Sequence, residues 1–262
     1  MATTRSVDGT LISYDRVGSG PAVVLVHGAM TDKSHPMLVS VATALQPWFT
    51  VFNYDRRGRG ESGDKQPYAV AREIEDLTAI VRAAGGSAMV FGGSSGAALV
   101  LAAAARNPAI TKVIVWEPPY HVDAGAPDIA ADFAEQLHAL VAADRRGDAV
   151  AMFMTEAAEM PADVVAAMRA DPSWAGAEAV AHTLAYEAAA LGPKNALPTG
   201  ILTAIAQPTL VLNGGNSPLW MMNAGKAVAA TIPRAAHRVL DGQTHNVAAE
   251  ALTPELLEFF TS

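Results

Sequence analysis

The pentapeptide Gly92–Gly96, which reads Gly-Gly-Ser-Ser-Gly, constrains the fold more than any other segment of this chain. It follows the short apolar run Ala88–Phe91 and precedes an Ala/Leu-rich stretch, so the pattern predicts a strand, a turn and a helix. A serine at such a sharp turn has a strained backbone, and its neighbours must be small for the chain to close. The pattern therefore predicts a tight turn that lifts the Ser94 hydroxyl above a sheet.

Strand-like and helix-like segments alternate along much of the chain. A helix is predicted over Val70–Ala84 and a short helix after Thr253-Pro254. The other predicted strands are the apolar runs Thr10–Tyr14, Ala22–Val26, Thr50–Tyr54, Lys112–Trp116, Thr209–Leu212 and Arg238–Leu240. Because continuous apolar runs bounded by turns are typical of strands buried on both faces, this alternation predicts an α/β fold with a doubly wound, mostly parallel sheet.

One long region breaks this alternation. Residues 120–204 are Ala-rich and helical in pattern, with no convincing strand. A chain of 262 residues fits one large domain with an insertion better than two independent domains. We therefore expect residues 1–119 and 205–262 to form the core and residues 120–204 to form a helical cap insertion.

Two segments are candidates for the chemistry around the Ser94 hydroxyl. His27-Gly28-Ala29-Met30 follows a predicted strand, and its Ala29 N–H is expected to form an oxyanion hole together with the Ser95 N–H at the start of the helix. The His27 side chain is expected to fix this loop by hydrogen bonding. Of the seven histidines, His245 has the best context for a base, because it lies in a loop after the last predicted strand.

These segments together resemble the α/β-hydrolase fold superfamily, in the group of small capped esterase-like serine hydrolases. The matching segments are Val26-His27-Gly28, Asp55–Ser62, Gly92–Gly96 and Gly242–His245, which occur in the family's order and span nearly the whole chain. The resemblance implies an α/β-hydrolase fold with a helical cap, and a nucleophile at Ser94. It also implies a structural role, with no catalytic step, for the Asp55–Ser62 loop.

The position of the family's catalytic acid departs from this pattern. The family usually has an Asp shortly after a strand of the type Leu-Val-Leu-x-Gly, and this chain has Ser217 there, before Pro218. Ser217 is expected to be a helix N-cap, with proline at the first helical position. Glu117, at the end of the Lys112–Trp116 strand, is the substitute that the resemblance suggests, because some members, including haloalkane dehalogenases, carry their acid at this neighbouring strand end.

The alternative is a Ser–His dyad without a carboxylate. In that case Ser217, Asn213 or Asn216 would give His245 a neutral hydrogen bond. Losing the orienting carboxylate lowers turnover by about 10⁴ in a serine protease, so a dyad would indicate slow hydrolysis or different chemistry.

Composition limits the partners. A net charge of −8 argues against a nucleic-acid partner, and the absence of cysteine excludes disulfides, thiolate metal sites and a cysteine nucleophile. The N-terminal sequence lacks an apolar signal region, and no apolar run is long enough to span a bilayer, so a cytoplasmic protein with no membrane partner is expected. We expect a small-molecule partner, no cofactor and no metal. Oligomeric state is not predicted.

Methionine and aromatic residues suggest the character of the pocket, although most of them are expected to pack the cap against the core. No cluster of Arg or Lys points to a phosphate or carboxylate substrate, so an apolar or aromatic substrate is expected. The residues expected to line the pocket are Met30, Tyr120, Phe153, Trp220 and Met221.

The leading hypothesis is a serine hydrolase that cleaves a carboxylic ester, thioester or lactone through an acyl-enzyme on Ser94, with His245 as base and Glu117 as acid. A non-hydrolytic cyclase, lyase or acyl transferase of a biosynthetic pathway is the alternative on the same fold. A ligand-binding protein derived from a hydrolase is a third hypothesis, which the presence of both Ser94 and His245 disfavours.

Overall fold

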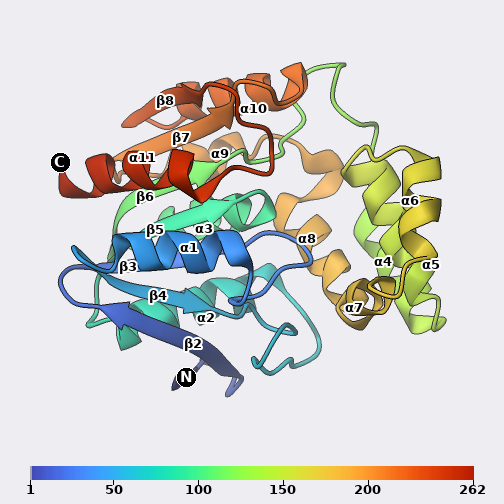
Figure 1. The fold of residues 1–262 in the computed structure, drawn as a ribbon, viewed down its shortest axis with the longest axis horizontal. Coiled ribbons are helices and arrows are strands. Elements are labelled where there is room, and N and C mark those ends of the chain that lie inside the picture. The colour runs from blue at the N-terminus through green and yellow to red at the C-terminus, as the bar shows by residue number, and fades with distance from the viewer. Residues whose placement is uncertain (1) are drawn as a thin grey trace.

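Eight strands form one sheet across residues 2–262, the part of the chain that the computed structural model describes (Figure 1). The sheet order is β1-β2-β4-β3-β5-β6-β7-β8; β2 pairs antiparallel with β1 and β4, and the other neighbours are parallel. The strands are β1 (Ala2–Arg5), β2 (Leu11–Gly18), β3 (Ala22–Val26), β4 (Thr50–Tyr54), β5 (Ala88–Gly93), β6 (Ile110–Trp116), β7 (Thr209–Gly214) and β8 (Ala235–Leu240).

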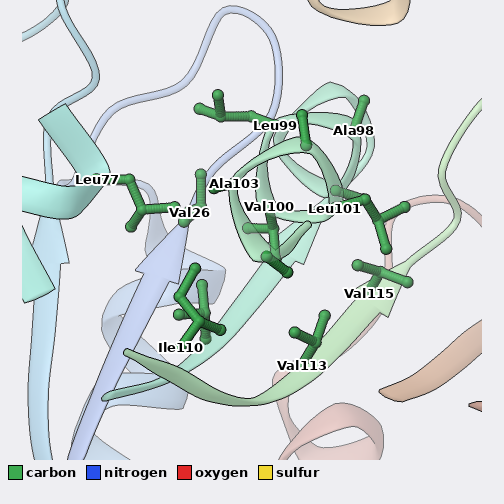
Figure 2. Packing of buried hydrophobic residues seen from close by; sticks show 14 of the residues in the cluster. Val26, Leu77, Ala98, Leu99, Val100, Leu101, Ala103, Ile110, Val113 and Val115 are labelled. Atoms are coloured by element: carbon green, nitrogen blue, oxygen red, sulfur yellow. The ribbon is translucent and has the colours of Figure 1, made fainter. Parts of the chain in front are cut away.

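Helices cover both faces of this sheet because successive side chains of a strand point to opposite sides. In β3, Val24 and Val26 belong to a cluster with α2 (Val70–Ala83) and α3 (Ser95–Ala104), which Figure 2 shows with α3 lying over the strands. Val23 and Leu25 belong to a second cluster, with α1 (Pro36–Leu45) and α11 (Ala249–Thr261). The predicted doubly wound sheet is therefore confirmed.

Helix α3 is buried along its whole length, and all ten of its residues are inaccessible to solvent. A helix that is apolar all round has no face for water and belongs in a core. Six of its residues are alanine or glycine, which lets the helix lie close to the sheet. The serine turn at its N-terminus is consequently held by a helix that is packed on all sides.

Between β6 and β7, the helices within residues 133–191 gather at one end of the sheet, whereas the short helix at residues 199–202 packs against α3 (Figure 1). The helices within residues 133–191 share a third hydrophobic cluster, and the last of them packs against both the first of them and α3. Among residues 2–262, no helix combines the length and apolar character needed to cross a membrane. The helices are α4 (Phe133–Ala142), α5 (Arg146–Met152) with a π-helical turn at Phe153–Ala157, α6 (Ala162–Arg169), α7 (Trp174–Ala179), α8 (Leu184–Leu191) and α9 (Thr199–Leu202).

Two helix starts differ from the sequence prediction. Helix α11 begins at Ala249 and contains Pro254 in its interior, so the proline does not mark its start. Helix α10 (Leu219–Thr231) begins after Pro218, and no side chain caps it. The predicted N-cap role of Ser217 is therefore wrong: Pro218 itself occupies the cap position, one residue further along the chain.

Candidate active site

The turn at Ser94 has the geometry that the glycines around it predict. Ser94 has φ 56° and ψ −128°, in the positive-φ region that L-residues rarely adopt. A Cβ on Gly92 would lie 2.7 Å from the Gly96 carbonyl oxygen, and a Cβ on Gly96 would lie 2.5 Å from the His27 carbonyl oxygen. A Cβ on Gly93 would meet no such restriction, since the nearest atom, on the Phe91 ring, would lie 3.9 Å away. Two of the three glycines are thus sterically required.

The loop after β3 lies directly against this turn. A Cβ on Gly28 would lie 3.0 Å from the Ser94 Cβ, so a larger residue here would require the serine turn to shift. Ala29 and Met30 follow, and both line the same cavity as Ser94 and Ser95. The structure thus brings together the two backbone segments that the sequence suggests as oxyanion donors.

His27, in contrast, does not face the chemistry. Its ring is buried, and burial together with the nearby guanidinium groups of Arg59 and Arg56 holds its pKa well below the usual range, so it is neutral. The backbone N–H of Arg56 donates to Nε2 at 3.3 Å, and Nδ1 lies 3.3 Å from both the Gly28 carbonyl oxygen and Arg59 Nη1. These contacts fix the loop, as the sequence suggests.

His245 and Glu117 meet across the carboxyl ends of β6 and β7. The His245 Nδ1 and Glu117 Oε2 atoms are 2.7 Å apart, and Glu117 is fully buried with a positive φ of 44°. The other carboxylate oxygen accepts the Gly214 N–H at 2.8 Å. The Trp116 Nε1 donates to the His245 carbonyl oxygen at 3.0 Å and holds the histidine loop in place.

The Glu117 carboxylate remains ionised despite its burial. Burial alone would raise its pKa, but the hydrogen bonds from His245 and the Gly214 N–H hold the pKa below its usual range.

The neutral partners that a dyad would use make other contacts. The Asn213 amide donates to Glu117 Oε1 at 3.4 Å and to the Met221 carbonyl oxygen at 3.1 Å, and Asn216 donates to the Gly242 carbonyl oxygen at 3.3 Å. Within residues 2–262 the hydrogen-bond partner of the His245 ring is Glu117.

Ser94 and His245 line the same cavity, although no hydrogen bond joins their side chains within the described part of the chain. Catalytic hydrogen bonds are often long in free enzymes and tighten when substrate binds, so this geometry is compatible with a nucleophile and its base. In the same part of the chain, no cluster of three or more His, Asp or Glu side chains is arranged as metal ligands.

The cavity above Ser94 has a volume of about 940 Å³ and is mainly apolar. Four of the five residues expected to line it do so, namely Met30, Phe153, Trp220 and Met221. Tyr120 does not: the chain turns at Pro118, whose carbonyl oxygen accepts the Tyr120 N–H, and the ring is buried in the core cluster that contains α3.

Other lining residues gave no clear signal in the sequence. Phe133 comes from α4, and Met37 comes from α1. Glu159 lies at the same cavity, where its carboxylate accepts the Trp220 Nε1–H at 2.6 Å. Their positions depend on how the helices pack, which periodicity alone does not specify.

Comparisons with known proteins identify the fold and the family. The structure is similar to that of an alpha/beta hydrolase from Sphaerobacter thermophilus DSM 20745, with a TM-score of 0.91 and 52% identity over 99% of this chain and 100% of that chain. It shares its fold with a thermophilic esterase from Thermogutta terrifontis, with a TM-score of 0.75 and 22% identity over 99% of this chain and 97% of that one.

The uncharacterized hydrolase YraK of Bacillus subtilis (strain 168) is 36% identical over 122 residues, which cover 44% of this chain and 44% of YraK, less than half of that relative's length. The sequence model of the alpha/beta hydrolase family matches residues 23–251, from β3 into α11. Because this match includes the serine turn, Glu117 and His245, the chain belongs to the alpha/beta hydrolase family.

Proposed function

We propose that this protein hydrolyses carboxylic esters through an acyl-enzyme on Ser94. The observation that carries the proposal is the 2.7 Å contact between His245 Nδ1 and the buried Glu117 carboxylate, in a cavity that also contains Ser94. A carboxylate in this position holds the imidazole with its proton on Nδ1 and leaves Nε2 free to accept a proton.

In the first half of the reaction, His245 Nε2 takes the proton of the Ser94 hydroxyl as Oγ attacks the ester carbonyl carbon. The Ala29 and Ser95 N–H groups hold the resulting oxyanion, and the Ser95 N–H gains from its place at the N-terminus of α3. His245 then gives its proton to the leaving alkoxide oxygen. The C–O bond breaks, the alcohol departs, and the acyl group remains on Ser94.

In the second half, water repeats the same sequence. His245 removes a proton from the water, whose oxygen attacks the acyl carbon and forms a second tetrahedral intermediate. The intermediate collapses as His245 returns the proton to Ser94 Oγ, which releases the carboxylic acid. Glu117 stays ionised throughout and stabilises the imidazolium that forms in each half.

The apolar walls of the cavity support an ester, thioester or lactone with an apolar or aromatic group. We also propose that residues 120–204 act as a cap, because Phe133, Phe153 and Met160 of this segment line the cavity. Flexible methionines together with aromatic rings allow several substrate shapes to be accommodated.

A fluorophosphonate probe and p-nitrophenyl esters of increasing acyl length test the nucleophile. The native protein is expected to be labelled and to turn over these esters, and Ser94→Ala is expected to lose both properties because the neighbouring Ser95 is buried as the first residue of α3 and does not occupy the apex of the turn. Ser87→Ala, which removes an exposed serine ahead of β5, is the matched control and should keep both.

Undiminished labelling of Ser94→Ala would show that the nucleophile lies elsewhere. Negligible ester turnover by the folded native protein would instead favour a cyclase, lyase or acyl transferase.

A further inference from the structure

The peptide bond between Gly28 and Ala29 links the proposed oxyanion hole to the interior of the protein. Its N–H belongs to Ala29 and its carbonyl to Gly28, and both lie in one rigid plane. In a trans peptide these two groups point in opposite directions. Whatever fixes the Gly28 carbonyl therefore also fixes the direction of the Ala29 N–H.

Three side-chain groups surround the Gly28 carbonyl oxygen. An Nη1–H of Arg59 donates to it at 2.6 Å, the Thr31 hydroxyl at 3.1 Å, and the His27 Nδ1 lies at 3.3 Å. The guanidinium contact is the shortest and the only one of these three that carries a full charge. Charge-assisted hydrogen bonds are about twice as strong as neutral ones, so Arg59 is the main anchor of this carbonyl.

Arg59 is itself fixed by a carboxylate from the helices between β6 and β7. Its Nη2 forms an ion pair with Glu187 of α8, and both side chains are buried. The second oxygen of Glu187 accepts an Nη1–H of Arg56 at 2.8 Å, and Arg56 is paired in turn with Glu73 of α2 at 2.8 Å. Arg56 also donates to the His27 carbonyl oxygen at 3.2 Å.

We propose that Arg59 is a positioning residue for the oxyanion hole, and that Glu187 of α8 holds it in place. This inference rests on the proposed function, in which the Ala29 N–H is an oxyanion donor. The guanidinium orients the Gly28–Ala29 peptide and, by polarising its carbonyl, strengthens the N–H at the other side as a donor.

This arrangement acts on the transition state more than on the substrate. An oxyanion donor is effective because it is oriented before negative charge develops, and losing one donor outright lowers turnover by about 10²–10³. Acylation and deacylation both pass through an oxyanion, so a misdirected Ala29 N–H slows both steps. Binding of the ester in its ground state does not depend on this N–H to the same extent.

Helix α8 also contributes to the cavity wall through Ala188 and Leu191, the first of which directly follows Glu187. One helix therefore contacts the substrate space and holds the anchor of the oxyanion loop. A shift of α8 would therefore move the cavity wall and the Glu187 carboxylate that holds Arg59 together.

Arg59→Lys tests the proposal, with Arg57→Lys as the matched control. Arg57 lies in the same loop and is equally buried, but it pairs with Asp76 at 2.6 Å and Asp8 at 3.1 Å. The measurements are kcat and KM for a p-nitrophenyl ester, the Ki of an aryl trifluoromethyl ketone that forms an oxyanion adduct with Ser94, and thermal unfolding of each variant.

Arg59→Lys is expected to lower kcat by about 10- to 30-fold, less than the loss of a donor, and to weaken ketone binding by a similar factor, with KM changed less than about 2-fold. Arg57→Lys should lower Tm but keep kcat and Ki within about 3-fold. If both variants change kcat and Ki alike, the proposal is overturned. If Arg59→Lys does not fold, Glu187→Gln provides the same test, and an unchanged kcat and Ki there would also overturn it. An inactive native protein would instead refute the proposed function.

Discussion

Glu117 and Ser217 follow two neighbouring parallel strands, and their side chains reach the same place from different sides. Trp116 of β6 pairs with Leu212 of β7, and the Glu117 N–H donates to the Leu212 carbonyl oxygen at 3.0 Å. Because the two strand ends lie side by side, a carboxylate on β6 can replace one after β7 while His245 stays in place.

Glu117→Gln is expected to lower kcat by about 10³- to 10⁴-fold with little change in KM, because the amide no longer fixes the imidazole tautomer or stabilises the imidazolium. Steady-state kinetics on a p-nitrophenyl ester measure this loss. Adding Ser217→Asp to Glu117→Gln puts an acid at the family's usual position and should restore part of the activity. A single Glu117→Gln variant that keeps most of its kcat would refute the proposed role of this carboxylate.

Those parts of the candidate site that depend on a local sequence motif could be predicted from the sequence. The spacing of glycines around Ser94 predicts the serine turn, whereas Glu117 became a candidate through the resemblance to α/β hydrolases that carry their acid at this strand end. The ring of Tyr120, however, lies in the core, because the direction of a side chain after Pro118-Pro119 depends on a turn that neither apolar pattern nor spacing encodes.

Helix α3 is the element that holds the serine turn, and its stability depends on apolar packing rather than on capping. It has no side-chain cap at its N-terminus, where Ser94 occupies the cap position with a backbone unsuited to capping. Leu99 and Leu101 are fully buried in different directions around the helix (Figure 2). The position of Ser94 is therefore maintained by the core beneath it.

Leu101→Ala in α3 is expected to lower the free energy of unfolding by about 2–5 kcal/mol, because it removes buried methyl groups and leaves a cavity. Urea denaturation followed by circular dichroism measures the change. Val239→Ala, at a side chain of β8 that is 42% exposed, should change it by less than about 1 kcal/mol. Equal effects of the two substitutions would mean that α3 is not part of the stabilising core.

Elements with continuous apolar runs could be predicted almost to the residue. The runs at Ala22–Val26 and Thr50–Tyr54 coincide with β3 and β4, both of which are buried by helices. Strand β1 was not predicted, because its four residues are mostly polar and exposed at the edge of the sheet. Its hydrogen bonds to β2 depend on register between strands and not on hydrophobic pattern.

At the scale of the whole molecule, the chain buries charges that its composition would place in water. Arg56, Arg57 and Arg59 follow one another in a single loop and are all buried. Arginine is rarely buried without carboxylate partners, and each of these three has at least one. Such pairing joins segments far apart in sequence, which no local pattern could have predicted.

The pairing of Arg57 makes stability depend on pH through Asp8, in the turn between β1 and β2. Burial alone would raise the pKa of Asp8, but hydrogen bonds from Thr10 and Arg57 lower it to about 2, from 3.8 in an unfolded chain. A lowered pKa stabilises the fold above pH 3.8, and this contribution disappears as the pH falls through 2.

Asp8→Asn is therefore expected to lower the free energy of unfolding at pH 7 by about 1 kcal/mol, a value that allows for solvent screening near the surface. The difference from the native protein should shrink by about half at pH 3. Urea denaturation midpoints at the two pH values measure it. A difference that stays constant or grows toward pH 3 would contradict the assigned pKa.

The separate hydrophobic cluster of the helices between β6 and β7 has a consequence for how such a protein can diversify. Because these side chains pack mainly against one another, they can be exchanged for those of a relative while the packing of the sheet and the serine turn stays intact. Glu187 limits this freedom, since it pairs with two buried arginines of the core. A transplanted set of helices must bring a carboxylate to that point, or it will leave the buried Arg59 without a carboxylate partner, because Arg56 would keep only Glu73.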